Sequence, residues 1–388
     1  MPIRSVPVVV LAPDSFKGSL DAPAVAAAIE IGARRVWPDV EVRIRPMADG
    51  GEGTLDAVLA SAGPRGERRT LAVRDAAGTP QEAAYGLLRD ERGTTAVVEA
   101  AQIVGITDAS GMRAPVSQRD TRGIGELIRA LLDQGVRRFM IGLGGSSTND
   151  GGAGLLAELG LQLIDAHGNA SMPTPAGLAD LARVNGARLD ARLSDASITI
   201  MSDVNNPLSG ERGATTIFGP QKGVLPADIQ AIDGVLRAFA AKAEAALGRE
   251  AASQPGAGAA GGLGFALRLL GGTFASGAEV VADLVGLDAA LQGADWAITG
   301  EGRTDVQTLL GKTPFVVAQR AARANVPVTL LSGAVDAAAL AELGRVFAGC
   351  FALPSGPMSL ERCIAEAPTL LADRAEALAR LFGAARVR

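Results

Sequence analysis

The segment Ile141–Gly154 (I-G-L-G-G-S-S-T-N-D-G-G-A-G) limits what this chain can fold into more than any other. An apolar run from Phe139 enters it and a helical leucine pattern leaves it, so a strand, a glycine-rich turn and a helix follow in succession. Glycines allow a ligand to approach the backbone closely, and free N–H groups at a helix start bind anions. The alternative is a tight turn capped by Asn149 or Asp150. The many glycines favour phosphate or carboxylate binding.

Both ends of the chain carry apolar strands of the kind that parallel sheets bury. The first two are Val6–Leu11 and Val40–Ile44, and each runs into a polar loop followed by a helical pattern. The last three are Trp296–Thr299, Val326–Leu331 and Val346–Leu353. Continuous apolar runs that alternate with helices are typical of a parallel sheet covered on both faces. Two strands are too few to bury a sheet, so we expect the two ends to share one parallel sheet of about five strands.

The middle of the chain has a different rhythm. Strand patterns at Arg69–Arg74, Glu82–Leu88 and Thr94–Glu99 follow one another without intervening helices, which predicts a β-meander. The chain is therefore predicted to be an α/β protein of two α/β domains. Residues 1–65 and 286–388 would form a discontinuous, Rossmann/flavodoxin-like parallel-sheet domain, and residues 66–285 an inserted mixed α/β domain. The active site is expected in the cleft between them.

Two further segments give expectations that a structure can test. Ser202–Gly223 shows little regular pattern, and a structureless stretch of this length inside a compact domain is usually functional. Leu360–Phe382 has apolar residues at helical spacing throughout, which predicts one closing helix.

Composition and charge exclude several classes of function. The 388 residues carry a net charge of −5 with acidic and basic residues interspersed, so neither a nucleic-acid partner nor a membrane surface is expected. No apolar run approaches the roughly 20 residues of a membrane-spanning helix. The cysteine usage predicts a cytoplasmic protein. Cys350 and Cys363 are interpreted as reduced core thiols. His167 is the only histidine and lies in a polar turn, so histidine triads and histidine-rich zinc sites are excluded.

The known phosphate-binding motifs do not match fully. Gly311-Lys312-Thr313 could end a Walker motif, but Val306 stands where its first glycine is required. A G-x-G-x-x-G begins at Gly256, yet no strand precedes it, so the dinucleotide-binding context is missing. The piece Gly142–Ser147 is similar to the G-L-G-S-S motif of GHMP-type kinases but contains an extra glycine.

Several polar loops next to glycine carry more ionisable groups than simple turns need. Phosphoryl transfer uses this combination, because cations and backbone N–H groups bind phosphate oxygens while carboxylates serve Mg²⁺ and the attacking hydroxyl. A helix cap or a surface charge explains each acid alone; five such loops together favour a site. The loops contain Asp14, Ser15 and Lys17; Asp49 and Glu52; Asp203, Asn205 and Asn206; Lys222; and Glu301, Arg303 and Asp305.

The chain resembles the type I glycerate kinases almost from end to end. Seven motifs in order carry the resemblance: A-P-D-S-F-K-G-S from Ala12, A-D-G-G-E-G-T from Ala48, the glycine-rich central segment, D-V-N-N-P-L from Asp203, F-G-P-Q-K-G from Phe218, P-G-A-G-A-A-G-G from Pro255 and T-G-E-G-R-T-D-V-Q-T-L-L-G-K-T-P from Thr299. Two positions depart from the family pattern: Ser202, where a cysteine is frequent, and Ser146-Ser147, where Ser-Ala is common. Neither change removes a charged group.

The resemblance implies phosphorylation of D-glycerate by ATP with Mg²⁺, with 2-phosphoglycerate as the product. It also implies two α/β domains, in agreement with the discontinuous arrangement predicted above. The partners expected are therefore D-glycerate and ATP, and the protein is expected to be a monomer or a homodimer.

We assign roles to the candidate residues as hypotheses. Asp203 is the first candidate for accepting the hydroxyl proton and Asp49 the second, and Lys17 or Lys222 would supply positive charge. Arg303 would pair with the glycerate carboxylate through its bidentate guanidinium. Nucleotide phosphates would lie on Gly144, Gly145, Ser146, Ser147, Thr148, Asn149, Asp150 and Lys222. The substrate would also contact Asp14, Ser15, Glu52 and Asn206, and Mg²⁺ would bind Asp305 and Glu301.

Three alternatives stay open at this point. Glycine loops do not identify the acceptor, so a kinase or phosphatase for another small hydroxy acid, or a kinase acting on the 3-hydroxyl, fits the same residues. An NAD-dependent oxidoreductase would use a similar sheet but lacks a strand-borne G-x-G-x-x-G. A non-catalytic protein that binds an anionic metabolite is the third alternative.

Overall fold

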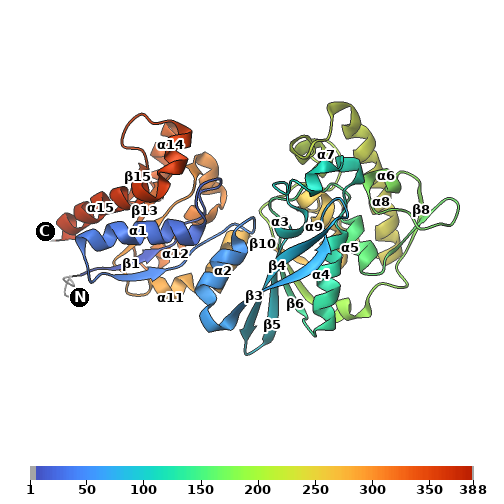
Figure 1. Cartoon of the computed structure of the whole chain (residues 1–388), viewed down its shortest axis with the longest axis horizontal. Helices are drawn as coiled ribbons and strands as arrows, with labels where there is room; N and C mark the ends of the chain where they lie inside the picture. Colours follow the sequence, from blue (N-terminus) through green and yellow to red (C-terminus); the bar gives the residue numbers. More distant parts are fainter. Residues whose placement is uncertain (1–5, 387–388) are drawn as a thin grey trace. The chain divides into compact units, whose positions relative to one another are not determined.

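The computed structural model describes residues 6–386, and the chain forms two compact units (Figure 1). Unit 1 combines the chain up to Asp49 with residues 56–63 and 278–388. Unit 2 consists of residues 50–55 and 64–277. Each unit has its own sheet and its own hydrophobic core.

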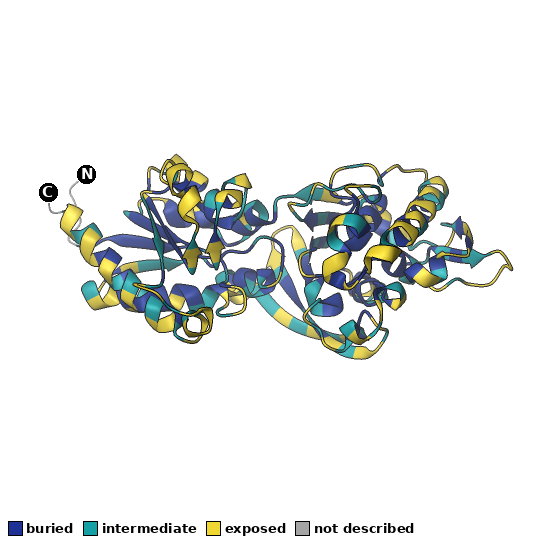
Figure 2. Ribbon diagram, turned by 90° about the horizontal axis from the view of Figure 1, so that it is seen from above, coloured by how far each residue is buried: buried dark blue, intermediate teal, exposed yellow. Residues whose placement is uncertain are grey.

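Unit 1 is built on a five-stranded sheet to which both ends of the chain contribute. Its order is β15-β13-β11-β1-β2, and all neighbouring strands are parallel. The three central strands are almost wholly buried and the two edge strands are partly exposed (Figure 2), which explains the continuous apolar runs. The strands are β1 (Val8–Leu11), β2 (Glu41–Ile44), β11 (Trp296–Thr299), β13 (Val328–Ser332) and β15 (Gly349–Ala352).

Helices α1 (Ala22–Val36) and α15 (Ala367–Arg386) pack together over one face of this sheet. Asp21 caps α1 by accepting a hydrogen bond from the N–H of Ala24. The predicted single closing helix 360–382 is wrong in one respect, because α14 (Leu360–Ala365) ends before α15 begins and Glu366 lies between the two helices. The other helices of unit 1 are most of α2 (Thr54–Ala62), α10 (Gly277–Leu284), α11 (Leu287–Leu291), α12 (Thr313–Arg323) and α13 (Leu340–Leu343).

Unit 2 contains a mixed six-stranded sheet in the order β10-β9-β6-β5-β4-β3. The first three strands in the chain pair antiparallel, so the predicted meander is confirmed. The remaining pairs in this sheet are parallel. Its strands are β3 (Gly66–Arg74), β4 (Pro80–Asp90), β5 (Gly93–Glu99), β6 (Arg138–Gly142), β9 (Ser197–Met201) and β10 (Thr273–Ala275). The predicted α/β class, with a parallel sheet and a second mixed sheet, is therefore confirmed.

The expectation that residues 202–223 lack regular structure is only partly right. This stretch contains α7 (Ala214–Phe218) and a 3₁₀ turn at Pro220–Lys222, both too short to show helical periodicity. A small antiparallel pair, β7 (Gln162–Asp165) and β8 (Leu181–Asn185), lies outside the main sheet. The other helices are α3 (Ala101–Val104), α4 (Arg122–Asp133), α5 (Ala153–Glu158), α6 (Pro175–Leu178), α8 (Ile229–Leu247) and α9 (Leu263–Leu269). Across residues 6–386, none of the helices is both long and apolar enough to span a membrane.

Candidate functional site

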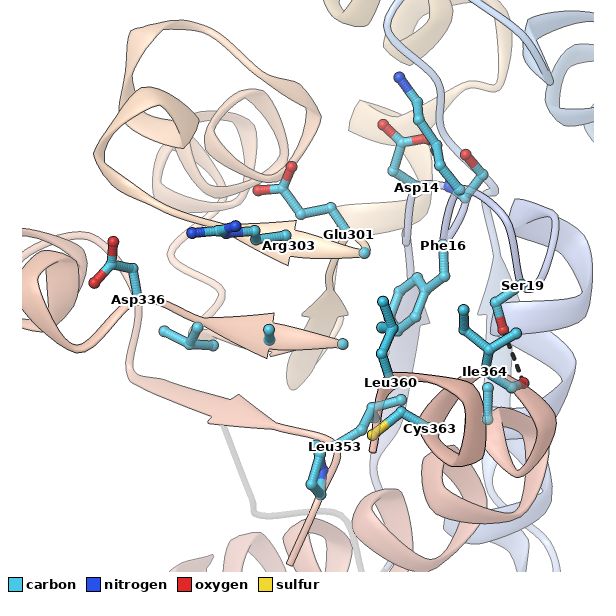
Figure 3. A pocket seen from close by; sticks show the side chains of 18 of the residues that line it. Asp14, Phe16, Ser19, Glu301, Arg303, Asp336, Leu353, Leu360, Cys363 and Ile364 are labelled. Atoms are coloured by element: carbon cyan, nitrogen blue, oxygen red, sulfur yellow. Dashed lines mark hydrogen bonds between the residues drawn. The ribbon is translucent and has the colours of Figure 1, made fainter. Parts of the chain in front are cut away.

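A pocket of about 990 Å³ opens in unit 1 at the carboxyl ends of the parallel strands (Figure 3). The loops that follow β1, β11 and β13 all line it. Strands β1 and β11 are neighbours, and from this pair the chain proceeds to β2 on one side and to β13 and β15 on the other. The pair is therefore the topological switch point of the sheet, which is where open α/β sheets bind ligands.

Three predicted residues meet in the loops after β1 and β2. Asp14 is buried, and its Oδ1 accepts a hydrogen bond from the N–H of Ser15 at 2.6 Å. Lys17 is exposed, and its Nζ lies 3.7 Å from Oδ2 of Asp49. Burial, and then the neighbouring Asp49 carboxylate, raise the pKa of Asp14 to about 7. Asp14 thus titrates close to neutral pH, as a proton acceptor in catalysis should.

The loop after β11 brings further charges to the pocket. Glu301 and Arg303 both line it, and Arg303 begins β12 (Arg303–Thr304), which pairs with β14 (Ala334–Val335). Oε1 of Glu301 accepts hydrogen bonds from the hydroxyls of Thr304 and Thr308, at 3.0 and 2.6 Å. Burial is the main cause that raises the pKa of Glu301 above its usual value.

Asp305 stabilises the local structure of this loop. It caps the 3₁₀ turn that follows, accepting a hydrogen bond from the N–H of Gln307 at 2.8 Å. Its Oδ1 also lies 3.7 Å from Nζ of Lys312. Asp305 is not among the residues that line the pocket, whereas Glu301 and Lys312 are.

The central glycine-rich segment lies in unit 2, between β6 and α5. Gly144 and Gly145 are exposed, whereas the side chains from Ser147 to Asp150 are fully buried. A Cβ at Gly144 would lie 2.5 Å from the Cα of Gly51, so this position requires glycine because two backbone segments of unit 2 touch there. Any ligand that this segment binds would meet the main chain around Gly144 and Gly145.

Asp150 already accepts the hydrogen bonds that an external anion would use. Its Oδ2 accepts from the N–H and hydroxyl of Thr121 and from the N–H of Gly154, and its Oδ1 accepts from the N–H of Gly152. Burial raises the pKa of Asp150 to about 6, and the nearby Asp120 adds to the shift. The carboxylate thus ties the start of α5 to the start of α4.

Lys222 is buried against the same segment. Its Nζ donates to the hydroxyl of Ser146 at 3.1 Å and to the carbonyl oxygen of Thr148 at 2.8 Å. Burial lowers the pKa of Lys222 to about 7, although Asp150 opposes the shift. Asn149 donates to the hydroxyl of Thr215 on α7. The charged and amide groups of this cluster therefore hold unit 2 together.

The other predicted residues of unit 2 lie elsewhere in that unit. Asp203 is exposed in the loop after β9. The side-chain amide of Asn206 donates a hydrogen bond to the carbonyl oxygen of Arg212 at 2.8 Å, and the main-chain carbonyl oxygen of Asn206 accepts one from the N–H of Gly258. Glu52 is exposed in the short segment 50–55. These three side chains are not among the residues that line the pocket of unit 1.

The carboxylates of the pocket fit magnesium held together with a phosphate ligand. Within residues 6–386, no group of three or more histidine, cysteine, aspartate or glutamate side chains is placed to hold a metal ion. Mg²⁺ in phosphate-transferring sites commonly uses one or two carboxylates and completes its shell with water and substrate phosphates. Asp14, Asp49 and Glu301 all line one pocket and offer such carboxylates.

Sequence reasoning missed two features of the pocket. Lys312 was given no role of its own in the sequence analysis, although the local sequence Gly311-Lys312-Thr313 before a helix was itself a signal. The pocket also has an apolar wall formed by Leu353, Pro354, Met358, Leu360, Cys363 and Ile364. No motif identifies that wall, because it gathers residues from a strand end and a short helix.

Comparison with known proteins agrees with this architecture. The model of the glycerate kinase family matches residues 9–383. A glycerate kinase of Halalkalibacterium halodurans is 39% identical over 96% of this chain and 97% of its own, and the glycerate 2-kinase of Escherichia coli K12 is 41% identical over 84% and 85%. A crystal structure of a candidate glycerate kinase 2 from Salmonella typhimurium LT2 superposes with a TM-score of 0.85 at 38% identity, covering 99% of this chain and all of that one.

These matches show that the protein is a kinase of the two-unit α/β type. The chain belongs to the glycerate kinase family. The resemblance recognised in its seven sequence motifs is thereby confirmed.

Proposed function

We propose that this protein phosphorylates D-glycerate with Mg²⁺ and ATP and that it forms 2-phosphoglycerate. The observation that carries the proposal is the near-complete alignment with relatives named glycerate kinase, one of them a glycerate 2-kinase. The 2-hydroxyl as acceptor rests on the Escherichia coli relative and on the resemblance of the motifs.

The chemistry of the pocket in unit 1 supports phosphoryl transfer. Lys17, Arg303 and Lys312 line it as cations, and Asp14 and Asp49 as acids. Catalysis of phosphoryl transfer depends mainly on positioning and on neutralising charge. Glu301 would hold Mg²⁺, together with whichever of Asp14 and Asp49 does not serve as the base, and the ion when bound neutralises charge on the phosphate oxygens.

The remaining roles are proposed residue by residue. Arg303 would bind the glycerate carboxylate in a bidentate pair. Asp203, and after it Asp49, would accept the hydroxyl proton. Asp14 joins these two as a third candidate, because a pKa of about 7 matches the task of a general base. For the glycine-rich segment, burial of Ser147–Asp150 leaves the main chain of Gly144 and Gly145 as the part that a phosphate can contact.

A coupled assay tests the reaction. ADP release from Mg-ATP is measured with D-glycerate as the acceptor, and the product is passed directly to enolase without a mutase. Consumption by enolase would support 2-phosphoglycerate. ADP release with a product that enolase ignores would move the phosphate to the 3-hydroxyl. Absence of ADP release from folded protein would leave another hydroxy acid, or binding without turnover, as the function.

Three single substitutions separate the candidate bases. Asp203→Asn, Asp49→Asn and Asp14→Asn each remove one carboxylate with little change of size. The true base should lose turnover by at least about 100-fold, with a smaller effect on the KM for glycerate. Near-full turnover of Asp203→Asn would exclude the first candidate.

A further inference from the structure

The pocket of unit 1 has two chemically different ends (Figure 3). Asp14, Lys17 and Asp49 from the strand ends form the charged end, together with Lys312. The other end is apolar and is lined by Leu353, Leu360, Cys363 and Ile364. A ligand that fits both ends must itself be charged at one end and apolar at the other.

The size of the pocket suits the larger of the two proposed substrates. Ligand sites typically enclose about 300–1,000 Å³, and this pocket, at about 990 Å³, lies at the upper limit. Glycerate, a three-carbon acid, would fill only a small part of this pocket and has no apolar group to contact the apolar wall. An adenine nucleotide has the required length, a flat apolar base and a polyanionic tail.

Helix α12 contributes its N-terminus, as well as the side chain of Lys312, to the charged end of the pocket. This eleven-residue helix begins at Thr313, and Lys312 at its N-cap lines the pocket. The N-terminus of a helix presents free N–H groups and a positive dipole end that favour phosphate. The hydroxyl of Thr313, the first residue of the helix, is buried and lies close enough to the Asp14 carboxyl to lower the pKa of that acid.

The apolar end has side chains that water contacts. Leu360 and Ile364, on α14, are 74% and 40% exposed. Exposed apolar side chains that lie next to one another along a groove are typical of ligand surfaces. The hydroxyl of Ser19 donates to the carbonyl oxygen of Ile364 at 3.2 Å, so α14 is attached to the loop that carries Asp14 and Lys17. The wall and the charged end are thus parts of one site.

We propose that the pocket of unit 1 is the nucleotide site, with the phosphate chain at Lys312 and the start of α12 and the base on the wall of Leu353, Leu360, Cys363 and Ile364. This rests on the proposed function, because it takes the phosphate donor to be an adenine nucleotide. It replaces the assignment of the nucleotide to the glycine-rich segment of unit 2.

Calorimetric titration of the full chain with MgADP tests both ends. Lys312→Ala should weaken binding at least about 10-fold, because a charge-assisted contact to phosphate is lost. Leu360→Asp should weaken it by a similar factor, because a carboxylate replaces part of the apolar wall. The matched controls are Lys242→Ala on α8 and Leu381→Asp on α15; neither residue lines the pocket, and Leu381 is 63% exposed. Both controls should stay within about 2-fold of the parent protein.

Alkylation of the two cysteines gives a second readout that needs no substitution. Cys363 lines the pocket, whereas Cys350 lies on β15 and does not. Bound MgADP should slow the reaction of iodoacetamide with Cys363 at least about 10-fold and leave Cys350 unchanged, and D-glycerate alone should protect neither.

The outcomes separate this inference from the proposed function. If MgADP binds and neither variant weakens it while Cys363 stays unprotected, the nucleotide lies elsewhere and only the present inference fails. If no adenine nucleotide binds the folded parent protein at millimolar concentration, both the kinase function and the nucleotide site fail.

Discussion

Asp14 shows how the fold changes an ordinary carboxyl group. In an unfolded chain this acid titrates near pH 3.8, and in the pocket near pH 7, because burial and the Asp49 carboxylate both oppose its ionisation. The folded state therefore binds more protons than the unfolded state between these two values. By linkage, Asp14 makes the protein less stable as pH rises from about 4 to about 7.

Asp14→Asn removes this cost. Relative to the parent, the variant should gain little at pH 4 and gain up to about 4 kcal/mol of unfolding free energy at pH 8, since both states of the parent are then ionised. Activity at pH 8 should fall sharply. Denaturant unfolding at the two pH values checks the first expectation. An equal change in stability at both pH values would show that Asp14 titrates normally.

Lys222 is the opposite case, a buried cation whose pKa falls from 10.5 to about 7. The unfolded state binds more protons between these values, so this lysine adds stability as pH rises from about 7 to about 10.5. Lys222→Met should remove that rise, whereas Lys242→Met should keep it. Thermal unfolding of the three proteins from pH 7 to pH 10 measures the difference. Parallel pH profiles for the parent and Lys222→Met would contradict the expectation.

At the scale of single residues, the sequence predicted the charged end of the pocket better than the rest of the site. Asp14, Lys17 and Asp49 follow apolar strands, so their place at the carboxyl edge of a sheet followed from the pattern. The sequence could not show that Asp150 and Lys222 are enclosed. Polar residues among glycines look alike whether they bind a ligand or each other, and only packing separates the two cases.

At the scale of elements, helix α4 depends on a glycine in its first turn. A Cβ at Gly123 would lie 1.9 Å from the carbonyl oxygen of Arg74, a backbone atom of β3. Gly123→Ala should therefore destabilise unit 2 by about 1–3 kcal/mol, because α4 must move away from the sheet. The matched control is Gly234→Ala on α8 of the same unit, where nothing lies within 4 Å of the added carbon.

The control should be neutral or stabilising by up to about 1 kcal/mol, because alanine favours a helix over glycine. Far-UV circular dichroism in urea gives both values. Similar losses in the two variants would mean that the substitution acts through helix propensity and not through contact with Arg74.

Prediction of elements depended on length and on burial. The strands β1 and β11 are fully buried, and their continuous apolar runs identified them although each has only four residues. The two-residue strands β12 and β14 and the short helix α7 carry too few residues to show a period. The break between α14 and α15 was missed because apolar residues keep their helical spacing across Glu366.

At the scale of the whole molecule, the tryptophans distinguish the two units. The chain has two tryptophans, Trp37 and Trp296, and both lie in unit 1, where each contacts the ring of Phe382. Tryptophan fluorescence should therefore follow unit 1, and circular dichroism both units. We expect the two urea curves of the parent protein not to coincide, and coincident curves would mean that both units unfold together.

The sheet of unit 1 also sets an order of events during synthesis. Strand β1 pairs with β2 on one side and with β11 on the other, and β11 is translated only after all of unit 2. At about 5–20 residues per second, β1 leaves the ribosome tens of seconds before β11, its second neighbour in the sheet. Unit 2 can complete its core before β1 pairs with β11. A nascent chain of this protein thus presents apolar β1 to the cell for longer than any other strand, and chaperones would meet it there.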